Sequence, residues 1–210
     1  AIKQAGVEIK LNSPVGSDLT FDKLFKQGFK AIFVAAGAHM SRNLGIGGIF
    51  LDGIIQGTDF LKNVKLDQPP DIAGKKVAII GGGNVAIDVA RSAVRLGAGE
   101  VHVACLESPD EMFASEEEVE EALIEGVKIH NRHAPKRFVG DDNHVTGIEF
   151  VDCLSVFDKN GKFNPEVKPG TERIMPVDMV IIAIGQGLEM SLLDASGSKL
   201  DTKAGFITTD

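Results

Sequence analysis

The order of hydrophobic and polar positions changes several times along the chain and predicts a different kind of element each time. Near the start, Val7–Leu11 alternates apolar and polar residues, which predicts a short strand. Thr20 is a suitable N-cap for a short helix that runs to Gln27. Lys30–Ala36 is a continuous apolar run rich in β-forming residues, which is typical of a buried parallel strand.

The pattern becomes regular after a Pro-containing linker at Gln68–Asp71, which follows a predicted helix over Thr58–Leu66. From there, short apolar runs alternate with amphipathic stretches that end at glycines. This order is typical of a parallel sheet with crossover helices. The predicted strands are Val77–Ile80, Val101–Leu106 and Val127–His130, and the predicted helices are Asn84–Leu96 and the acidic stretch Ser115–Glu125.

The following region is typical of antiparallel structure. Ala134–Phe157 predicts two strands joined by a turn at Asp141–Asn143, and Lys159–Gly161 is a second strong turn signal. Lys168–Glu172 is predicted to be a loop, and Val177–Ile184 to be another buried strand. We therefore expect an α/β fold, in which a Rossmann-like parallel sheet with crossover helices is combined with an antiparallel β-meander.

Two similar apolar runs, Ala31–Gly37 and Met179–Gly185, flank the strand–helix region. Such a pair suits a chain that leaves one domain, builds another and returns. The sequence thus predicts an inserted domain over residues 71–179, with residues 1–70 and 180–210 as its flanks.

Composition and charge narrow the possible functions. The 210 residues carry a formal net charge of −8, which argues against binding to nucleic acid or to an anionic membrane surface. The two cysteines, Cys105 and Cys153, lie too far apart for a CxxC motif, so a reducing cytoplasm is the expected location. No apolar run is long enough for a transmembrane helix. The chain begins without Met and ends without a closing element, so we expect a piece of a longer protein.

The glycine-rich turn after the first strand of the α/β region carries the candidate chemistry. It matches G-x-G-x-x-A directly between a predicted strand and a predicted helix, as a dinucleotide-binding turn requires. Gly81 permits the tight turn, Gly83 lets a pyrophosphate approach the backbone, and Ala86 lets the helix pack closely. Free amides at the helix start attract phosphate, and Asn84 can donate a hydrogen bond to it. A glycine turn without a ligand is the alternative. The expected cofactor-binding residues here are Gly81, Gly82, Gly83, Asn84, Val85 and Ala86.

Glu107 follows the next predicted strand and is the candidate for binding the ribose. An acidic residue at this place accepts hydrogen bonds from the adenosine ribose hydroxyls, which suits NAD, and it repels a 2′-phosphate. A solvated glutamate at a strand end is the alternative. Met112 and Phe113, a few residues later, could border an adenine pocket or could simply pack.

The other polar and reactive groups are expected to be structural. Asp88 and Arg91 are spaced i,i+3 and predict a surface ion pair. Cys105, in a buried strand, is expected to be a core residue. His130 and His133 are three apart in a predicted strand, so they should point to opposite faces, and no metal site is expected. No catalytic residue is predicted, because the cofactors carry hydride chemistry.

Four segments together resemble the pyridine-nucleotide domain of the glutamate synthase small-subunit family. They are Gly81–Arg91, Val101–Glu107, Glu111–Ala114 and Glu121–Val127. The flanking strands, Gly28–Gly37 and Asp178–Gln186, are similar to the paired crossover strands of such flavoproteins.

The resemblance implies an NAD(P)-binding domain, residues 71–179, inserted into an FAD-binding domain to which residues 1–70 and 180–210 belong. It makes Gly185, at the end of the returning strand, a further cofactor-binding candidate. It also implies hydride transfer between nicotinamide and flavin, with electrons passing on to an iron–sulfur or other partner subunit.

The chain departs from the family pattern in ways that affect the cofactors. Where the family usually has Tyr-Arg-Arg, this chain has Cys105-Leu106-Glu107, which favours NAD over NADP. The FAD fingerprint is missing upstream, and the family's flavin-holding Gly-Asp segment would fall past Asp210. FAD is therefore expected in the full-length protein, and this chain is expected to lack the main FAD-binding parts.

Two other functions stay open. The chain could be a non-catalytic module that senses NAD and contacts a partner. It could also be a self-contained NAD dehydrogenase, which needs a proton-transfer residue such as a His or a Tyr–Lys pair. The chain has no Tyr, and no His is expected at the C-terminus of a strand facing the crevice.

Overall fold

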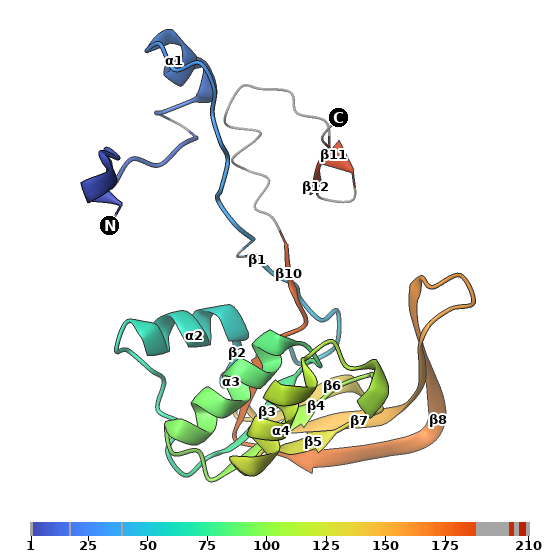
Figure 1. The fold of residues 1–210 in the computed structure, drawn as a ribbon. Helices are drawn as coiled ribbons and strands as arrows, with labels where there is room; N and C mark the ends of the chain where they lie inside the picture. The colour runs from blue at the N-terminus through green and yellow to red at the C-terminus, as the bar shows by residue number, and fades with distance from the viewer. Residues whose placement is uncertain (1, 17, 39, 188–201, 204–205, 209–210) are drawn as a thin grey trace. The chain divides into compact units, whose positions relative to one another are not determined.

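The computed structural model describes residues 2–16, 18–38, 40–187, 202–203 and 206–208, and the structural statements below concern these residues. The chain divides into two compact units, Ala1–Met40 with Gln186–Asp210, and Ser41–Gly185 (Figure 1). The second unit contains the whole of the expected 71–179 span. Among the described residues, none of the helices combines the length and apolar character needed to cross a bilayer.

The first unit contains few regular elements. Thr20 caps α1 (Phe21–Lys26) as predicted, because its hydroxyl oxygen accepts a hydrogen bond from the Lys23 amide at 3.2 Å. The other elements are the 3₁₀ helix η1 (Lys3–Ala5), the strand β10 (Gln186–Gly187) and the antiparallel pair β11 (Thr202–Lys203) and β12 (Phe206–Ile207). The short strand β1 (Met40–Ser41) lies where the chain passes into the second unit.

Two strands predicted in the first unit are absent from it. Val7–Leu11 and Lys30–Ala36 are both irregular, so these predictions are wrong. A strand is stabilised by hydrogen bonds to a neighbour, and no described strand pairs with either segment. The apolar pattern of Lys30–Ala36 consequently buries little, and Phe33 is 92% exposed.

The second unit is built around a parallel sheet of five strands, which confirms the predicted α/β class. The strand order is β2-β9-β3-β4-β5, so the chain continues from β3 to β4 on one side and returns as β9 on the other. A ligand crevice is expected at such a reversal, outside the carboxyl ends of the strands. The strands are β2 (Ile54–Gln56), β3 (Lys76–Ile80), β4 (Glu100–Ala104), β5 (Lys128–His130) and β9 (Met179–Ile182).

Helices cover one face of this sheet and a second sheet covers the other (Figure 1). Val77 and Ile79 of β3 pack on the helix side, while Ala78 and Ile80 pack toward the second sheet. Because both faces are covered, β3 is apolar almost throughout, as a central parallel strand should be. The helices are α2 (Gly57–Lys65), α3 (Asn84–Arg95) and α4 (Glu116–Ile124), with a 3₁₀ turn η2 (Pro109–Glu111) before α4.

The second sheet is the antiparallel meander β6-β7-β8, formed by β6 (His133–Asp141), β7 (His144–Phe157) and β8 (Phe163–Pro176). The turn predicted between β6 and β7 is confirmed, with Asp142 and Asn143 both at positive φ, as in tight hairpins.

The loop predicted at Lys168–Glu172 is wrong, because these residues lie inside β8. The register shows a bulge there: Phe150 pairs with Arg173, whereas Asp152 pairs with Lys168. The Asp152 amide donates to the Thr171 hydroxyl at 3.0 Å, so a side chain replaces the missing ladder bond.

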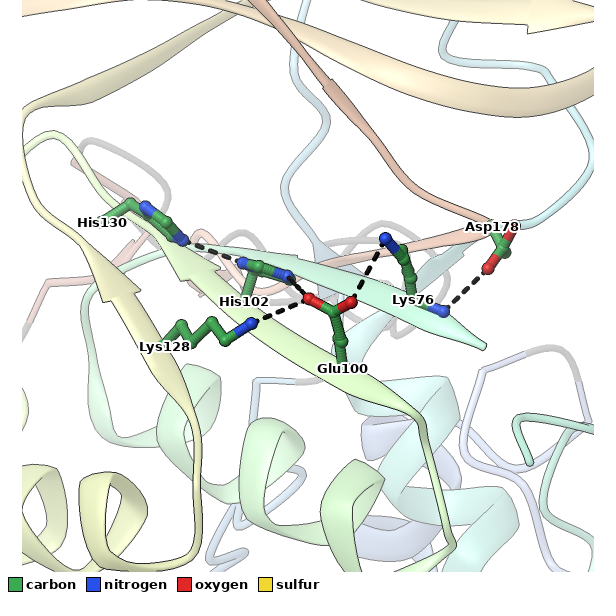
Figure 2. A network of polar contacts seen from close by, with 6 residues as sticks. All are labelled: Lys76, Glu100, His102, Lys128, His130 and Asp178. Atoms are coloured by element: carbon green, nitrogen blue, oxygen red, sulfur yellow. Dashed lines mark hydrogen bonds and ion pairs between the residues drawn. The ribbon is translucent and has the colours of Figure 1, made fainter. Parts of the chain in front are cut away.

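A polar row joins three strands of the parallel sheet (Figure 2). Glu100 forms ion pairs with Lys128 at 2.8 Å and Lys76 at 3.2 Å, and hydrogen bonds from these lysines lower its carboxyl pKa to about 2. His102 Nε2 donates to Glu100 at 3.3 Å, and His102 Nδ1 lies 2.9 Å from His130 Nε2. The amide of Lys76 donates to the Asp178 carboxylate at 2.8 Å.

Candidate functional site

The glycine turn after β3 is fixed by its neighbours on both sides. A Cβ atom at Gly81 would overlap the carbonyl oxygen of Ala183, and one at Gly82 would lie 2.8 Å from the Glu107 carboxylate. A Cβ atom at Gly83, in contrast, would meet nothing within 4 Å. Packing therefore requires glycine at position 81, whereas at position 82 the clash is with the flexible end of the Glu107 side chain, and the third glycine keeps a space open.

The start of α3 faces that open space without a cap. Gly83 is the N-cap and supplies no side-chain hydrogen bond, and the first turn contains no acidic residue. The first amides of an uncapped helix need acceptors, and together with the helix dipole they favour an anion. Ala86 is fully buried, which allows α3 to pack closely.

Two hydrogen bonds tie the loop between β4 and α4 to this turn. The Ala114 amide donates to the Gly82 carbonyl at 3.1 Å, and the Ser115 amide donates to Asn84 Oδ1 at 3.1 Å. Ser115 also caps α4, as predicted, by accepting a hydrogen bond from the Glu118 amide. Asn84 thus joins the starts of α3 and α4.

A cavity of about 670 Å³ lies at the carboxyl ends of β3, β4 and β9, at the reversal of strand order. This volume is in the range of small-molecule and cofactor sites. Six of the eight predicted residues line it, whereas Asn84 and Ala86 do not; the six are Gly81, Gly82, Gly83, Val85, Glu107 and Gly185. Other lining residues could not be predicted from the sequence, chiefly Arg42, Asn43, His133, Phe157 and Phe163.

Glu107 is held in place by its own backbone. Its carbonyl accepts hydrogen bonds from the Arg132 amide and from Asn131 Nδ2, each at 3.1 Å. Its carboxylate lies against Gly82, and Glu107 is one of the residues that line the cavity. Four residues of the segment after β4 line the cavity and none is basic: Cys105, Leu106, Glu107 and Phe113.

The two cysteines are buried, and their thiols are not activated as nucleophiles. Burial, with the nearby Glu107 carboxylate, raises the pKa of the Cys105 thiol to about 12, and burial also raises the pKa of Cys153. A nucleophilic or redox-active thiol needs a lowered pKa. The prediction that Cys105 is a core residue is confirmed.

His133 lines the cavity from the start of β6, a position that was not predicted for a histidine. The prediction that it points away from His130 is wrong. The two rings lie 5.2 Å apart between centroids, because His130 ends β5, His133 begins β6 and Arg132 turns the chain between them at positive φ.

Both ring nitrogens of His133 are engaged. Nδ1 donates to the Asn131 carbonyl at 2.7 Å, and Nε2 accepts from Arg173 at 2.9 Å. This arrangement gives no support to a proton-transfer role. The described residues also contain no group of three His, Cys, Asp or Glu side chains placed to hold a metal ion.

The predicted ion pair of Asp88 with Arg91 is wrong. Arg91 instead pairs across the helix interface with Glu121 and Glu125 of α4, and Glu125 also pairs with Arg95. The partners of Arg91 are carboxylates of the neighbouring helix α4. The i,i+3 spacing of Asp88 and Arg91 within α3 therefore does not determine which residue Arg91 pairs with.

Comparisons with known proteins agree with this geometry. A family model described as pyridine nucleotide-disulphide oxidoreductase matches residues 2–210. The chain is 43% identical over 197 residues to NADP(+)-dependent formate dehydrogenase subunit beta of Moorella thermoacetica, which covers 92% of this chain and 28% of that protein. It is 34% identical over 212 residues to the glutamate synthase [NADPH] small chain of Halomonas elongata, which covers 96% of this chain and 44% of that protein.

The fold is also that of a solved oxidoreductase. FprA of Mycobacterium tuberculosis superposes with a TM-score of 0.78 at 20% identity, over 95% of this chain and 58% of that one. At this identity the likeness shows the fold alone. The chain thus spans less than half of the two relatives by sequence and somewhat more than half of the solved structure.

Proposed function

The chain belongs to the pyridine nucleotide-disulphide oxidoreductase family, and from that premise we propose that Ser41–Gly185 binds the nicotinamide dinucleotide of an NAD(P)H-dependent flavoprotein. One observation carries the proposal: the uncapped start of α3 after Gly83 opens into the same cavity as the Glu107 carboxylate. A helix start of this kind binds phosphate, and an acidic residue after the second strand binds ribose hydroxyls.

Each part of the dinucleotide then has a place along the strand ends. The pyrophosphate lies at the amides that follow Gly83, and the adenosine ribose lies at Glu107, on the β4 side of β3. The nicotinamide end extends to the β9 side, where Ala183 and Gly185 line the cavity. Asn84 supports this arrangement indirectly, by holding the loop before α4.

We further propose that NAD is preferred over NADP. The support is Glu107, whose carboxylate would face a 2′-phosphate at the place where Leu106 and Glu107 stand instead of an arginine pair. Arg42 is the basic residue among the lining groups, but its amide bonds to the Gly185 carbonyl at 3.3 Å, on the β9 side. The relatives named above carry NADP(+) or NADPH in their names, so this preference distinguishes the chain from them.

The wider activity is proposed for the whole protein. In it, FAD would exchange a hydride with the nicotinamide, and electrons would pass to a partner subunit or iron–sulfur centre; the names "subunit beta" and "small chain" of the relatives support such a partner. The NAD domain expected over residues 71–179 would extend to Ser41–Gly185, because β2 and β9 belong to its sheet, and the remaining parts of the expected flanks, residues 1–40 and 186–210, would belong to the FAD domain. Between a strand and a helix of the described residues, the G-x-G-x-x-A pattern occurs at Gly81–Ala86, and we assign it to the nicotinamide dinucleotide.

A reducing compartment such as the cytoplasm suits this protein, because its two free cysteines are buried and unpaired.

Titration of the chain with NADH by calorimetry tests the proposal. Gly83→Ala should weaken binding by about 10-fold or more, because its Cβ enters the space for the pyrophosphate. Its melting temperature should stay unchanged, since no atom lies within 4 Å of that Cβ. Glu120→Ala, an exposed change on α4, is the control. No binding of NADH or NADPH by the wild-type chain, or equal binding by Gly83→Ala, would overturn the proposal.

A further inference from the structure

Three phenylalanine rings line the cavity, and one of them, Phe157, contacts the other two edge to face. Phe157 lies 6.5 Å from Phe113 and 6.2 Å from Phe163, between ring centroids, with interplanar angles of 87° and 76°. Phe113 is 68% exposed, Phe157 is 40% exposed and Phe163 is 61% exposed. Aromatic rings gain most when they are removed from water, so three exposed rings gathered on one cavity wall indicate a ligand surface.

The β-hairpin holds two of these rings rigidly. Phe157 and Phe163 are cross-strand partners at the end of β7 and the start of β8, beside the turn. Asp158 Oδ1 accepts hydrogen bonds from the Asn160 amide at 2.8 Å and from the Lys162 amide at 3.0 Å, which fixes that turn. The rings are therefore presented to the cavity by a preorganised element.

Phe113 is placed from the opposite side. It precedes Ala114, whose amide donates to the Gly82 carbonyl, so Phe113 is positioned relative to the glycine turn itself. Phe113 also belongs to the segment after β4, as Glu107 does. Because Phe157 contacts Phe113, the hairpin rings lie beside the segment that carries Glu107.

We propose that Phe113, Phe157 and Phe163 form an adenine platform, a surface on which the adenine ring of the dinucleotide stacks. This inference rests on the proposed function, because the base reaches the rings only when the glycine turn and Glu107 hold the pyrophosphate and ribose. Stacking on an aromatic side chain accepts an adenine without reading its edges. The platform thus strengthens binding of the adenosine half of the ligand and leaves the choice between NAD and NADP to Glu107.

The absence of Trp and Tyr from the chain allows a direct test. Phe163→Trp introduces one fluorescent reporter at the platform, and Phe50→Trp introduces one at a ring that is 92% exposed and does not line the cavity. AMP and ADP-ribose should quench the tryptophan of Phe163→Trp, whereas nicotinamide mononucleotide should not. Phe50→Trp should respond to none of the three.

A second measurement separates stacking from packing. Phe157→Leu and Phe163→Leu should each weaken ADP-ribose binding by about 10-fold, leave the affinity for nicotinamide mononucleotide unchanged, and melt within a few degrees of the wild-type chain. Unchanged ADP-ribose affinity in both variants, with NADH still bound by the wild-type chain, would overturn the platform and leave the proposed function standing. A changed sedimentation rate without a changed nucleotide affinity would also overturn it, because the rings would then cover a protein contact. If the wild-type chain binds no dinucleotide, both proposals fail.

Discussion

The backbone of Gly81 lies against the carbonyl oxygen of Ala183, and this contact determines how β3 ends beside β9. The Ala183 amide donates to the Ile80 carbonyl at 2.8 Å, so the two chain segments remain paired to the last residue of β3. Gly81 has a φ of 140°, a conformation that side-chain-bearing residues rarely adopt. Position 81 therefore requires glycine for the fold before any ligand is present.

Gly81→Ala should lower the free energy of unfolding, by roughly 1–3 kcal/mol from backbone strain and by more from the overlap with Ala183. Urea denaturation followed by circular dichroism measures the change. Gly83→Ala serves as the matched control, since its Cβ has free space. If the two variants are equally stable, the structural account of this turn is wrong.

Glu107 should determine the choice of dinucleotide. Glu107→Ala should weaken NADH binding by about 10-fold, as expected for lost hydrogen bonds to a charged group, and should affect NADPH less. The double variant Leu106→Arg with Glu107→Arg should reverse the preference, because two guanidinium groups would then face the 2′-phosphate. Calorimetry with both dinucleotides measures the ratio. A wild-type chain that binds NADPH as tightly as NADH would contradict the assignment.

Local chemistry explains what the sequence predicted well. The start of α3 at Asn84, the Ser115 cap and the Asp141–Asn143 turn depend on residues adjacent in the chain, so they follow from spacing alone. The strand predicted at Lys30–Ala36 is wrong because a strand also needs a neighbouring strand to pair with, and the sequence of the segment does not specify one.

The cavity wall could be predicted only in part, for the same reason. Phe113 belongs to the segment after β4, which the sequence connects with the site, but Phe157 and Phe163 belong to the meander. Their register across β7 and β8, with its bulges, decides which side chains face the cavity. The sequence alone does not show that Phe157 and Phe163 lie near the glycine turn, because many residues separate them from it along the chain.

Arg91 should be more important to stability than Asp88. Arg91→Ala removes ion pairs to both Glu121 and Glu125 and should lower the melting temperature by a few degrees, whereas Asp88→Ala should leave it nearly unchanged. The effects of Arg91→Ala and Glu125→Gln should be less than additive, since they remove the same contact. Thermal melts of the single and double variants test this, and an additive result would exclude a coupled pair.

The two histidines of the polar row, His102 and His130, predict how the stability of the fold depends on pH (Figure 2). Burial lowers the pKa of His130 from its ordinary 6.5 to about 4, with His102, His133, Lys128 and Arg173 acting in the same direction. Burial also lowers the pKa of His102. The unfolded chain then binds protons more readily than the folded chain between about pH 6.5 and 4.

Stability should therefore be greatest above pH 6.5 and should decrease as the pH falls toward 4. The lowered pKa of Glu100 acts in the same sense at lower pH, between 4.5 and about 2, where protonation removes its ion pairs. Urea denaturation at a series of pH values should show a shallower slope from pH 6.5 to 4 in His130→Gln, because one of the groups that take up protons on unfolding is gone. His144→Gln, at an exposed end of β7, is the control and should keep the wild-type slope. An equal slope in His130→Gln and the wild-type chain would show that His130 is not kept neutral by the fold.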